Sequence, residues 1–92
     1  MIDGDAREFI EGLYYGDERF FFFDGEKYFL QGYFSKGKPM LELYVMENPK
    51  NHFAWRSISK NGEYPVKEFE SAPIFNGKTF WEAEQEIQWV DC

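Results

Sequence analysis

Side chains that could bind a metal or act as a nucleophile are few in this sequence and lie far apart. The chain has one histidine and one cysteine, Cys92, whereas a zinc site ordinarily takes several such ligands. Glu82 and Glu86 are spaced one helical turn apart and could hold a cation, but a solvated acidic helix face explains them more simply. Ser57 and Ser59 have no neighbouring base or orienting group. We therefore expect no metal site, no cofactor and no catalytic residues.

One segment has the outline of a nucleotide-binding motif. Residues 72–79, APIFNGKT, resemble a relaxed Walker A phosphate loop with Ala in place of the first glycine. Such a loop needs several backbone N–H groups that converge on the anion between a strand and a long helix, and Pro73 removes one of these donors. The parallel sheet that carries the motif is also larger than 92 residues can build. We predict instead a turn at Asn76-Gly77 and a helix N-cap at Thr79.

Aromatic side chains make up half of the hydrophobic residues. The chain of 92 residues contains 11 Phe, 6 Tyr and 3 Trp. Each ring buries a large area, so a small domain can build its core from a few of them, but its interior is too small for all of them. We therefore expect some rings at the surface, either at the edge of the core with their polar tips in water or together in a recognition patch.

Charge is distributed unevenly along the chain, whose net charge is −7. Residues 1–18 and 63–92 are acidic, and the stretch between them is mildly basic. A negative protein repels phosphate backbones at long range, which disfavours general nucleic-acid binding and favours basic partners. The sequence has no apolar run long enough to span a bilayer, no secretion signal and a single cysteine, so we expect a soluble cytoplasmic protein outside the membrane.

Capping signals predict a helix near each end of the chain. Asp5 and Glu8 have capping-box spacing, and the apolar residues that follow share one face of a helix over residues 5–15. Thr79 and Glu82 have the same spacing at the start of a closing helix. The apolar stripe of this closing helix consists of Phe80, Ala83, Ile87 and Val90.

Aromatic and alternating runs between these helices predict four strands. The strands are expected over residues 20–23, 26–35, 40–46 and 53–59, and turn signals lie at 24–25, 36–38, 48–49 and 61–62. Asp24-Gly25 is the strongest of these signals, because this dipeptide accepts positive φ at both central positions of a tight hairpin. Residues 65–74 form a connection whose structure the pattern does not decide.

These elements predict a single α+β domain over residues 1–92. We expect a two-layer sandwich in which an antiparallel meander of about four strands carries one N-terminal and one C-terminal helix on one face. Period-two alternation then assigns each strand residue to a face. The residues expected to face the helices are Tyr28, Leu30, Phe34, Leu41, Leu43 and Val45, and those expected to face outward include Lys27, Phe29, Gln31, Tyr33, Ser35, Glu42 and Tyr44.

The outward residues define the candidate binding site. Phe29, Tyr33, Tyr44 and Trp55 would form a platform of rings flanked by Lys27 and Arg56. Trp89 lies off the stripe of the closing helix and Trp81 flanks it, so either could be an anchor or could fold back onto the protein. The candidate binding residues are therefore Phe29, Tyr33, Tyr44, Trp55, Arg56, Trp81 and Trp89.

The sequence predicts an acidic, aromatic-rich, non-catalytic protein-interaction module, such as an inhibitor, an adaptor or an antitoxin-like protein, which uses its exposed aromatic side chains. Its partner is expected to be another protein and could be basic. The alternative is a nucleic-acid-related protein, which either stacks single-stranded bases on the aromatic sheet or mimics DNA with its acidic helices and inhibits a nuclease. Binding of a small apolar ligand between helices and sheet, and an enzyme with an unrecognised carboxylate pair, remain open. The same surface could also form a homodimer.

Overall fold

The computed structural model describes residues 1–46 and 51–90, and only the backbone of residues 51–53. Its centre is a five-stranded antiparallel sheet with the strand order β4-β3-β2-β1-β5. The strands are β1 Arg19–Phe23, β2 Glu26–Ser35, β3 Lys38–Met46, β4 Asn51–Ile58 and β5 Gln88–Val90. The helices are α1 Ala6–Leu13, α2 Val66–Ser71 and α3 Phe80–Ala83, and α3 continues into a short 3-10 turn, η1 Glu84–Glu86. The α+β class and the antiparallel sheet are as the sequence predicts.

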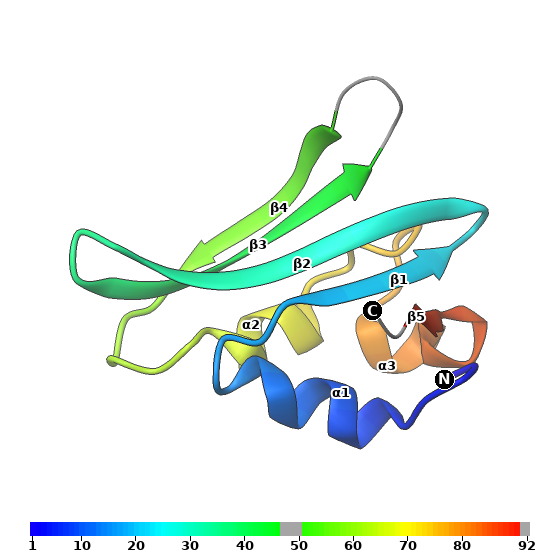
Figure 1. Ribbon diagram of the computed structural model, residues 1–92, viewed down its shortest axis with the longest axis horizontal. Helices are drawn as coiled ribbons and strands as arrows, with labels where there is room; N and C mark the ends of the chain where they lie inside the picture. Colours follow the sequence, from blue (N-terminus) through cyan, green and yellow to red (C-terminus); the bar gives the residue numbers. More distant parts are fainter. Residues whose placement is uncertain (47–50, 91–92) are drawn as a thin grey trace.

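All three helices lie on the same side of the sheet, as Figure 1 shows. Phenylalanine rings fill the space between the two layers: Phe9 of α1, Phe69 of α2 and Phe80 of α3 are fully buried and belong to one hydrophobic cluster. The sheet contributes inward-facing residues to the same cluster, namely Phe21, Phe23, Leu30, Leu41 and Leu43. The expected position of a small apolar ligand, between helices and sheet, is therefore occupied by side chains.

Two tight hairpins fix the register of the central strands. Asp24 and Gly25 have φ values of 52° and 79°, and Lys36 and Gly37 have 53° and 79°. Positive φ at both central residues is the signature of the turn whose twist matches paired antiparallel strands. The hairpin predicted at Asp24-Gly25 and the reversal predicted at residues 36–38 are confirmed.

The first helix begins where its cap predicts. The Asp5 side chain accepts a hydrogen bond of 2.8 Å from the backbone N–H of Arg7, which satisfies one of the free donors of the first turn. The helix ends at Leu13 and not at residue 15, and Gly16 takes a φ of 75° beyond it. Positive φ is readily reached by glycine, so Gly16 reverses the chain toward β1.

The closing helix is shorter than predicted, and the prediction of about four strands was wrong by one. Thr79 and Glu82 do form a reciprocal capping box, but α3 ends at Ala83. The chain then becomes extended, and β5 pairs with β1 and, through a parallel bridge, with Ile2. The extended form places Ile87 and Trp89 in the hydrophobic cluster together, whereas a helix would have separated them by about half a turn.

The segment between β4 and α3 contains a helix that no sequence pattern indicated. In α2 the buried residues are Val66 and Phe69. The turn predicted at Asn76-Gly77 is present, with φ values of 55° and 81°, and the Thr79 side chain caps α3 as predicted. The break predicted at Asn48-Pro49 and the terminal Cys92 lie outside the described residues.

Candidate functional site

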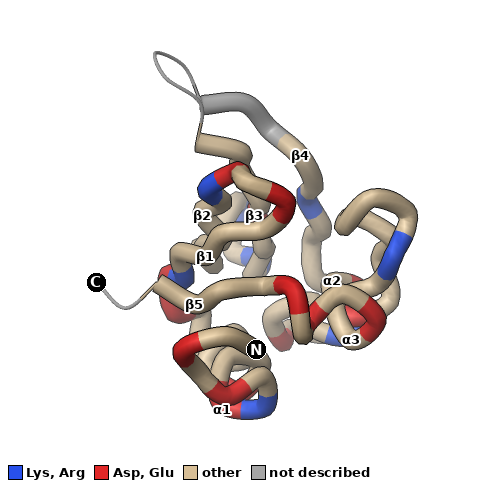
Figure 2. The backbone as a smooth tube through the Cα atoms, turned by 90° about the vertical axis from the view of Figure 1, so that its right-hand side faces the viewer, with Lys and Arg blue, Asp and Glu red and all other residues tan. Residues whose placement is uncertain are grey.

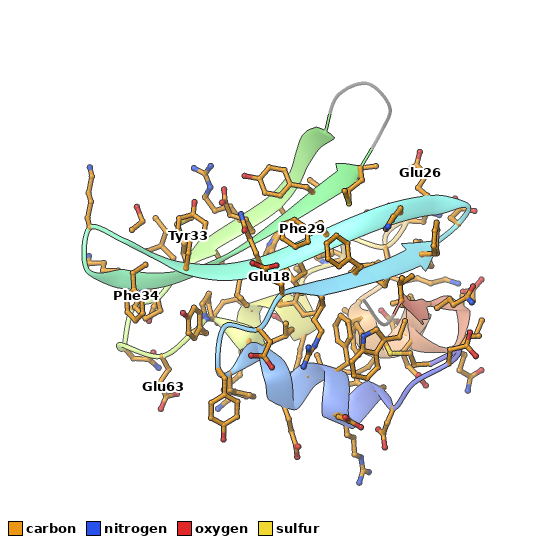
Figure 3. The ribbon with its side chains drawn as sticks, viewed as in Figure 1. Glu18, Glu26, Phe29, Tyr33, Phe34 and Glu63 are labelled. Carbon is orange, nitrogen blue, oxygen red and sulfur yellow. The ribbon has the colours of Figure 1, made fainter. Side chains whose placement is uncertain are left out.

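The face of the sheet turned away from the helices is covered by no helix of the described residues (Figure 1). We call it the outer face. The pairing register places a defined set of side chains on it, because each alternate residue of a strand points to the same side. The set consists of Phe20, Phe22, Lys27, Phe29, Gln31, Tyr33, Ser35, Lys38, Met40, Glu42, Tyr44, Met46, Arg56, Ile58, Gln88 and Val90. Figure 3 shows Phe29 and Tyr33 on this side of β2.

Aromatic rings cross the outer face from β1 to β3. Phe20 is the cross-strand partner of Phe29, and their rings stack with centroids 4.7 Å apart. Phe29 in turn pairs with Tyr44 on β3. The ammonium group of Lys27 lies 5.1 Å from the centroid of the Phe20 ring, within the range of a cation–π contact. Three adjacent strands thus contribute one continuous row of rings.

A buried carboxylate lies beside this row of rings. The side chain of Glu42 is 2% exposed, although it belongs to the outer face. Its Oε2 atom accepts from Nε of Arg56 at 3.0 Å and lies 2.9 Å from Nη2 of the same guanidinium, whose side chain is 49% exposed. A buried carboxylate is stable only when its oxygens have partners, so Arg56 and its neighbours fix the place of Glu42 in the sheet.

Two tyrosine hydroxyls share this carboxylate. A hydrogen bond from Tyr33 to Glu42 is the main cause that raises the pKa of Tyr33, and burial and the negative charge of Glu42 add to it. Burial is the main cause that raises the pKa of Tyr44, followed by the charge of Glu42 and a hydrogen bond to it. Arg56 opposes both shifts. Both phenols therefore remain protonated donors at neutral pH, and the cluster holds two rings in one orientation.

The structure brings four of the predicted site residues together on the outer face: Phe29, Tyr33, Tyr44 and Arg56. It does not bring Trp55 to them. Trp55 pairs with the inward residue Leu43, and its ring lies 5.7 Å from that of Phe69 in an edge-on contact. The register of β3 with β4 is regular from the Met40–Ile58 pair to the Leu43–Trp55 pair and shifts only beyond Trp55, so alternation along β4 turns Trp55 inward and Arg56 outward.

The two remaining tryptophans lie on the helical side. Trp81 is 44% exposed, and its indole N–H donates a 2.7 Å hydrogen bond to Glu70 of α2. Trp89 packs edge-on against Phe9 with ring centroids 5.6 Å apart, and the guanidinium of Arg19 lies 5.2 Å from its ring. Neither side chain shares a surface with the outer face.

A second group of exposed rings was not predicted from the sequence. Tyr15 is 82% exposed and Phe34 is 65% exposed, the largest values among the exposed large hydrophobic residues described. Phe34 was expected to face the core, and it does leave β2 on the inward side, but its position near the end of β2 leaves most of its ring in water. The adjacent pair Tyr14-Tyr15 was the one available sequence signal, because it lies beyond the buried residues Phe9, Ile10 and Leu13, where α1 ends.

The described residues contain no group of three or more His, Cys, Asp or Glu side chains that could hold a metal ion. None of the helices within residues 1–46 and 51–90 combines the length and the apolar character that crossing a bilayer requires. No protein family, curated protein or solved structure matches the chain.

Proposed function

We propose that this protein is a non-catalytic interaction module that binds a partner protein with its outer face. The observation that carries the proposal is the row of rings on an uncovered sheet face beside the buried Glu42. Rings are the side chains most often found at the energetic centre of protein interfaces. An apolar sheet face without a covering layer is likewise typical of a docking surface.

The cluster of Glu42 with Tyr33, Tyr44 and Arg56 supports this function because it restricts the movement of the rings before a partner binds. Tyr33 and Tyr44 are held by hydrogen bonds to one carboxylate, and Phe29 is held by stacking on Phe20. Ordering a free side chain at an interface costs about 0.5–1.5 kcal/mol. Rings that are already fixed in the unbound protein avoid most of that cost, so a flat partner surface can bind them with a larger net gain.

Local charge indicates what this partner presents. Among the described residues, the pairing register places Lys27, Lys38 and Arg56 on the outer face with one carboxylate, Glu42, while Asp24 and Glu26 lie at the adjoining β1–β2 turn. Acidic positions are instead concentrated along α1 and around α3, in the layer below the strands, as Figure 2 shows. The partner we infer therefore has an apolar patch bordered by carboxylates, although the chain as a whole is acidic. A basic partner would be favoured only for a contact on the helical side.

Affinity capture with outer-face variants tests the proposal. The protein is immobilised through Cys92, and partners retained from a lysate of the source cells are quantified for Tyr44→Ala and for the control Trp81→Ala, which removes an exposed ring on the helical side. We expect at least about a tenfold loss of the specific partner for Tyr44→Ala and no loss for the control. An unchanged set of partners in the Tyr44→Ala capture would contradict the proposal.

A second candidate function is stacking of single-stranded nucleic acid on the same face. The specific observation in its favour is the set of three cations around the rings, since such sites combine aromatic platforms with a basic groove. The test is a salt series with a fluorescent oligothymidine. Binding that weakens steeply with salt and is lost in Phe29→Ala would support this candidate, and absence of binding at low salt would exclude it.

A further inference from the structure

A groove separate from the outer face lies at the end of the molecule where β2 meets β3. It is open, has a volume of about 410 Å³, and is lined mainly by aromatic side chains and proline. Its principal walls are Tyr14, Tyr15, Phe34, Pro39 and Tyr64. Four segments of the chain meet here: the end of α1, the end of β2, the start of β3, and the loop that leads into α2. Figure 3 shows Phe34 and Glu63 at this end.

One wall of the groove, the ring of Tyr64, is seated against two glycines. A Cβ atom added to Gly32, which lies within β2, would stand 2.7 Å from the Cα of Gly16 and 2.7 Å from the ring of Tyr64. A Cβ atom at Gly16 would stand 2.5 Å from the Tyr64 hydroxyl. Real Cβ atoms do not approach so closely, so the ring of Tyr64 occupies space that only glycine leaves at both positions. Glycine within a strand is normally unfavourable, and here it seats a ring.

The other rings of the groove are exposed rather than packed. Tyr15 is 82% exposed and Phe34 is 65% exposed, whereas the Phe34 and Tyr64 rings contact each other at 5.9 Å with a tilt of 59°. Ring edges and faces thus line a trough that is open to water. Each exposed ring leaves apolar surface in contact with water. A bound chain that covers this surface would gain about 25 cal/mol of binding free energy for each Å² of apolar area buried.

Tyrosine, phenylalanine and proline side chains around a shallow trough suit one kind of ligand in particular. Polyproline II segments present a ridged apolar surface and solvent-exposed carbonyl oxygens, and they dock into aromatic-lined grooves at low entropic cost because they are extended before binding. Tyrosine hydroxyls at the rim can donate to those carbonyls. A folded strand could not use the groove in this way, because the groove offers rings and not a free backbone edge.

The charged residues around the groove indicate the orientation in which a ligand would bind. Among the described residues, Glu63 is the only charged one that lines the groove. Glu63 and Glu68 line an adjoining pocket with Lys60 and Lys67, and the exposed carboxylates of Glu11 and Glu18 flank the Tyr14-Tyr15 pair in the sequence. Lys36 and Lys38 lie in the turn and strand that follow Phe34. Basic residues of a ligand are therefore favoured at the α1 end and disfavoured at the β2–β3 turn.

We propose that this groove is a binding site for a proline-rich segment of a partner protein that has basic residues at the end of the segment lying near Glu63 and α1. The site shares no residue with the outer face, so it does not rest on the function proposed above.

The proposal is tested with a fluorescein-labelled peptide of two arginines followed by about ten prolines, whose extended form is roughly 31 Å long. Binding is measured by fluorescence anisotropy. We expect saturable binding, and we expect the dissociation constant to rise by about tenfold in Tyr15→Ala and in Phe34→Ala. Both side chains are mostly exposed, so neither substitution removes core packing.

Three controls separate this site from other causes. A peptide with the same two arginines followed by a glycine-serine repeat has the charge without the polyproline II form, and it should bind at least about tenfold more weakly. Phe22→Ala removes a ring that is 40% exposed on the outer face and should leave the dissociation constant unchanged. Gly32→Ala should weaken peptide binding, because the added Cβ displaces Tyr64 without removing any ring of the groove.

Two outcomes would overturn the proposal. Equal binding of the two peptides would mean that the arginines bind by charge alone, and unchanged affinity in both Tyr15→Ala and Phe34→Ala would place the peptide elsewhere. A failure of the outer-face variants in the capture experiment has no bearing on this result, since no residue of that face lines the groove.

Discussion

Removing the Arg56 guanidinium should destabilise the protein although Arg56 lies at the surface. Arg56→Met keeps the apolar stem of the side chain but removes the group that contacts Oε2 of Glu42 at 2.9–3.0 Å. The variant leaves a carboxylate that is 2% exposed without its guanidinium partner, beside the hydroxyls of Tyr33 and Tyr44. Burying a charge without a counter-charge is the costly part of such a change.

The size of the effect follows from the burial of the two partners. At about 3 Å and an effective dielectric constant of about 20, two unit charges attract by roughly 5.5 kcal/mol. Breaking a fully buried pair costs about 3–5 kcal/mol, whereas exposed pairs contribute about 1 kcal/mol or less. Glu42 is buried and Arg56 is half exposed, so we expect a loss of about 2 kcal/mol in the free energy of unfolding. For a chain of this length that corresponds to a fall of about 10 °C in Tm.

A double-mutant cycle with Glu42→Gln measures the coupling directly, by urea denaturation followed through tryptophan fluorescence. We expect a coupling energy of about 1.5 kcal/mol, above the roughly 0.3–0.5 kcal/mol within which independent sites add. Lys27→Met is the matched control, because it removes another cation of the outer face whose contact is with a ring. A coupling energy indistinguishable from zero would refute the role assigned to this ion pair.

Three further predictions use other parts of the molecule. The folded protein raises the pKa of Tyr33 and Tyr44 above 10.0, so the unfolded chain loses these protons at a lower pH than the folded protein does. The free energy of unfolding should therefore fall as pH rises beyond 10.0. In Glu42→Gln, ultraviolet titration should show a smaller upward shift in the pKa of Tyr33. Hydrogen bonds from Thr79 lower the pKa of Glu82 from its ordinary value of 4.5, so the free energy of unfolding should fall as pH falls below 4.5. In Thr79→Ala, the free energy of unfolding should depend less strongly on pH in this acid range. Phe69→Ala removes a fully buried ring and should cost about 3–5 kcal/mol in urea denaturation, and a cost below about 1 kcal/mol would contradict the packing described.

Local chemistry accounts for the parts of the fold that the sequence predicts well. The turn at Asp24-Gly25 needs positive φ at two successive residues, and that requirement is met by neighbouring residues alone. The caps at Asp5 and Thr79 are likewise contacts within three residues. Residues 88–90 are different, because their extended form depends on pairing with β1 and with Ile2, far away in the sequence. Propensity and periodicity contain no information on that pairing.

In the candidate site, too, some positions can be predicted from the sequence and others cannot. Alternation along one strand suffices to place Phe29 and Tyr33 on a common face, and the pairing of β2 with β3 adds Tyr44. Alternation along β4 separates Trp55 from Arg56, and only the pairing of Trp55 with Leu43 on β3 shows that Trp55 is the residue that faces inward. The burial of Glu42 also has no sequence signal, since a glutamate at an outward position is ordinarily solvated.

The rings of the outer face and those of the groove differ in how far the fold depends on them. This difference distinguishes the effect of a substitution on stability from its effect on binding. The outer-face tyrosines hydrogen-bond a buried carboxylate, so substitutions there change both stability and any contact with a partner. Tyr15 is 82% exposed, and its loss should change the free energy of unfolding by no more than about 0.5 kcal/mol. A ring that the fold does not need still carries the risk of aggregation that exposed apolar surface brings. The presence of this ring at the surface is accounted for by the proposed peptide groove and not by the requirements of the core.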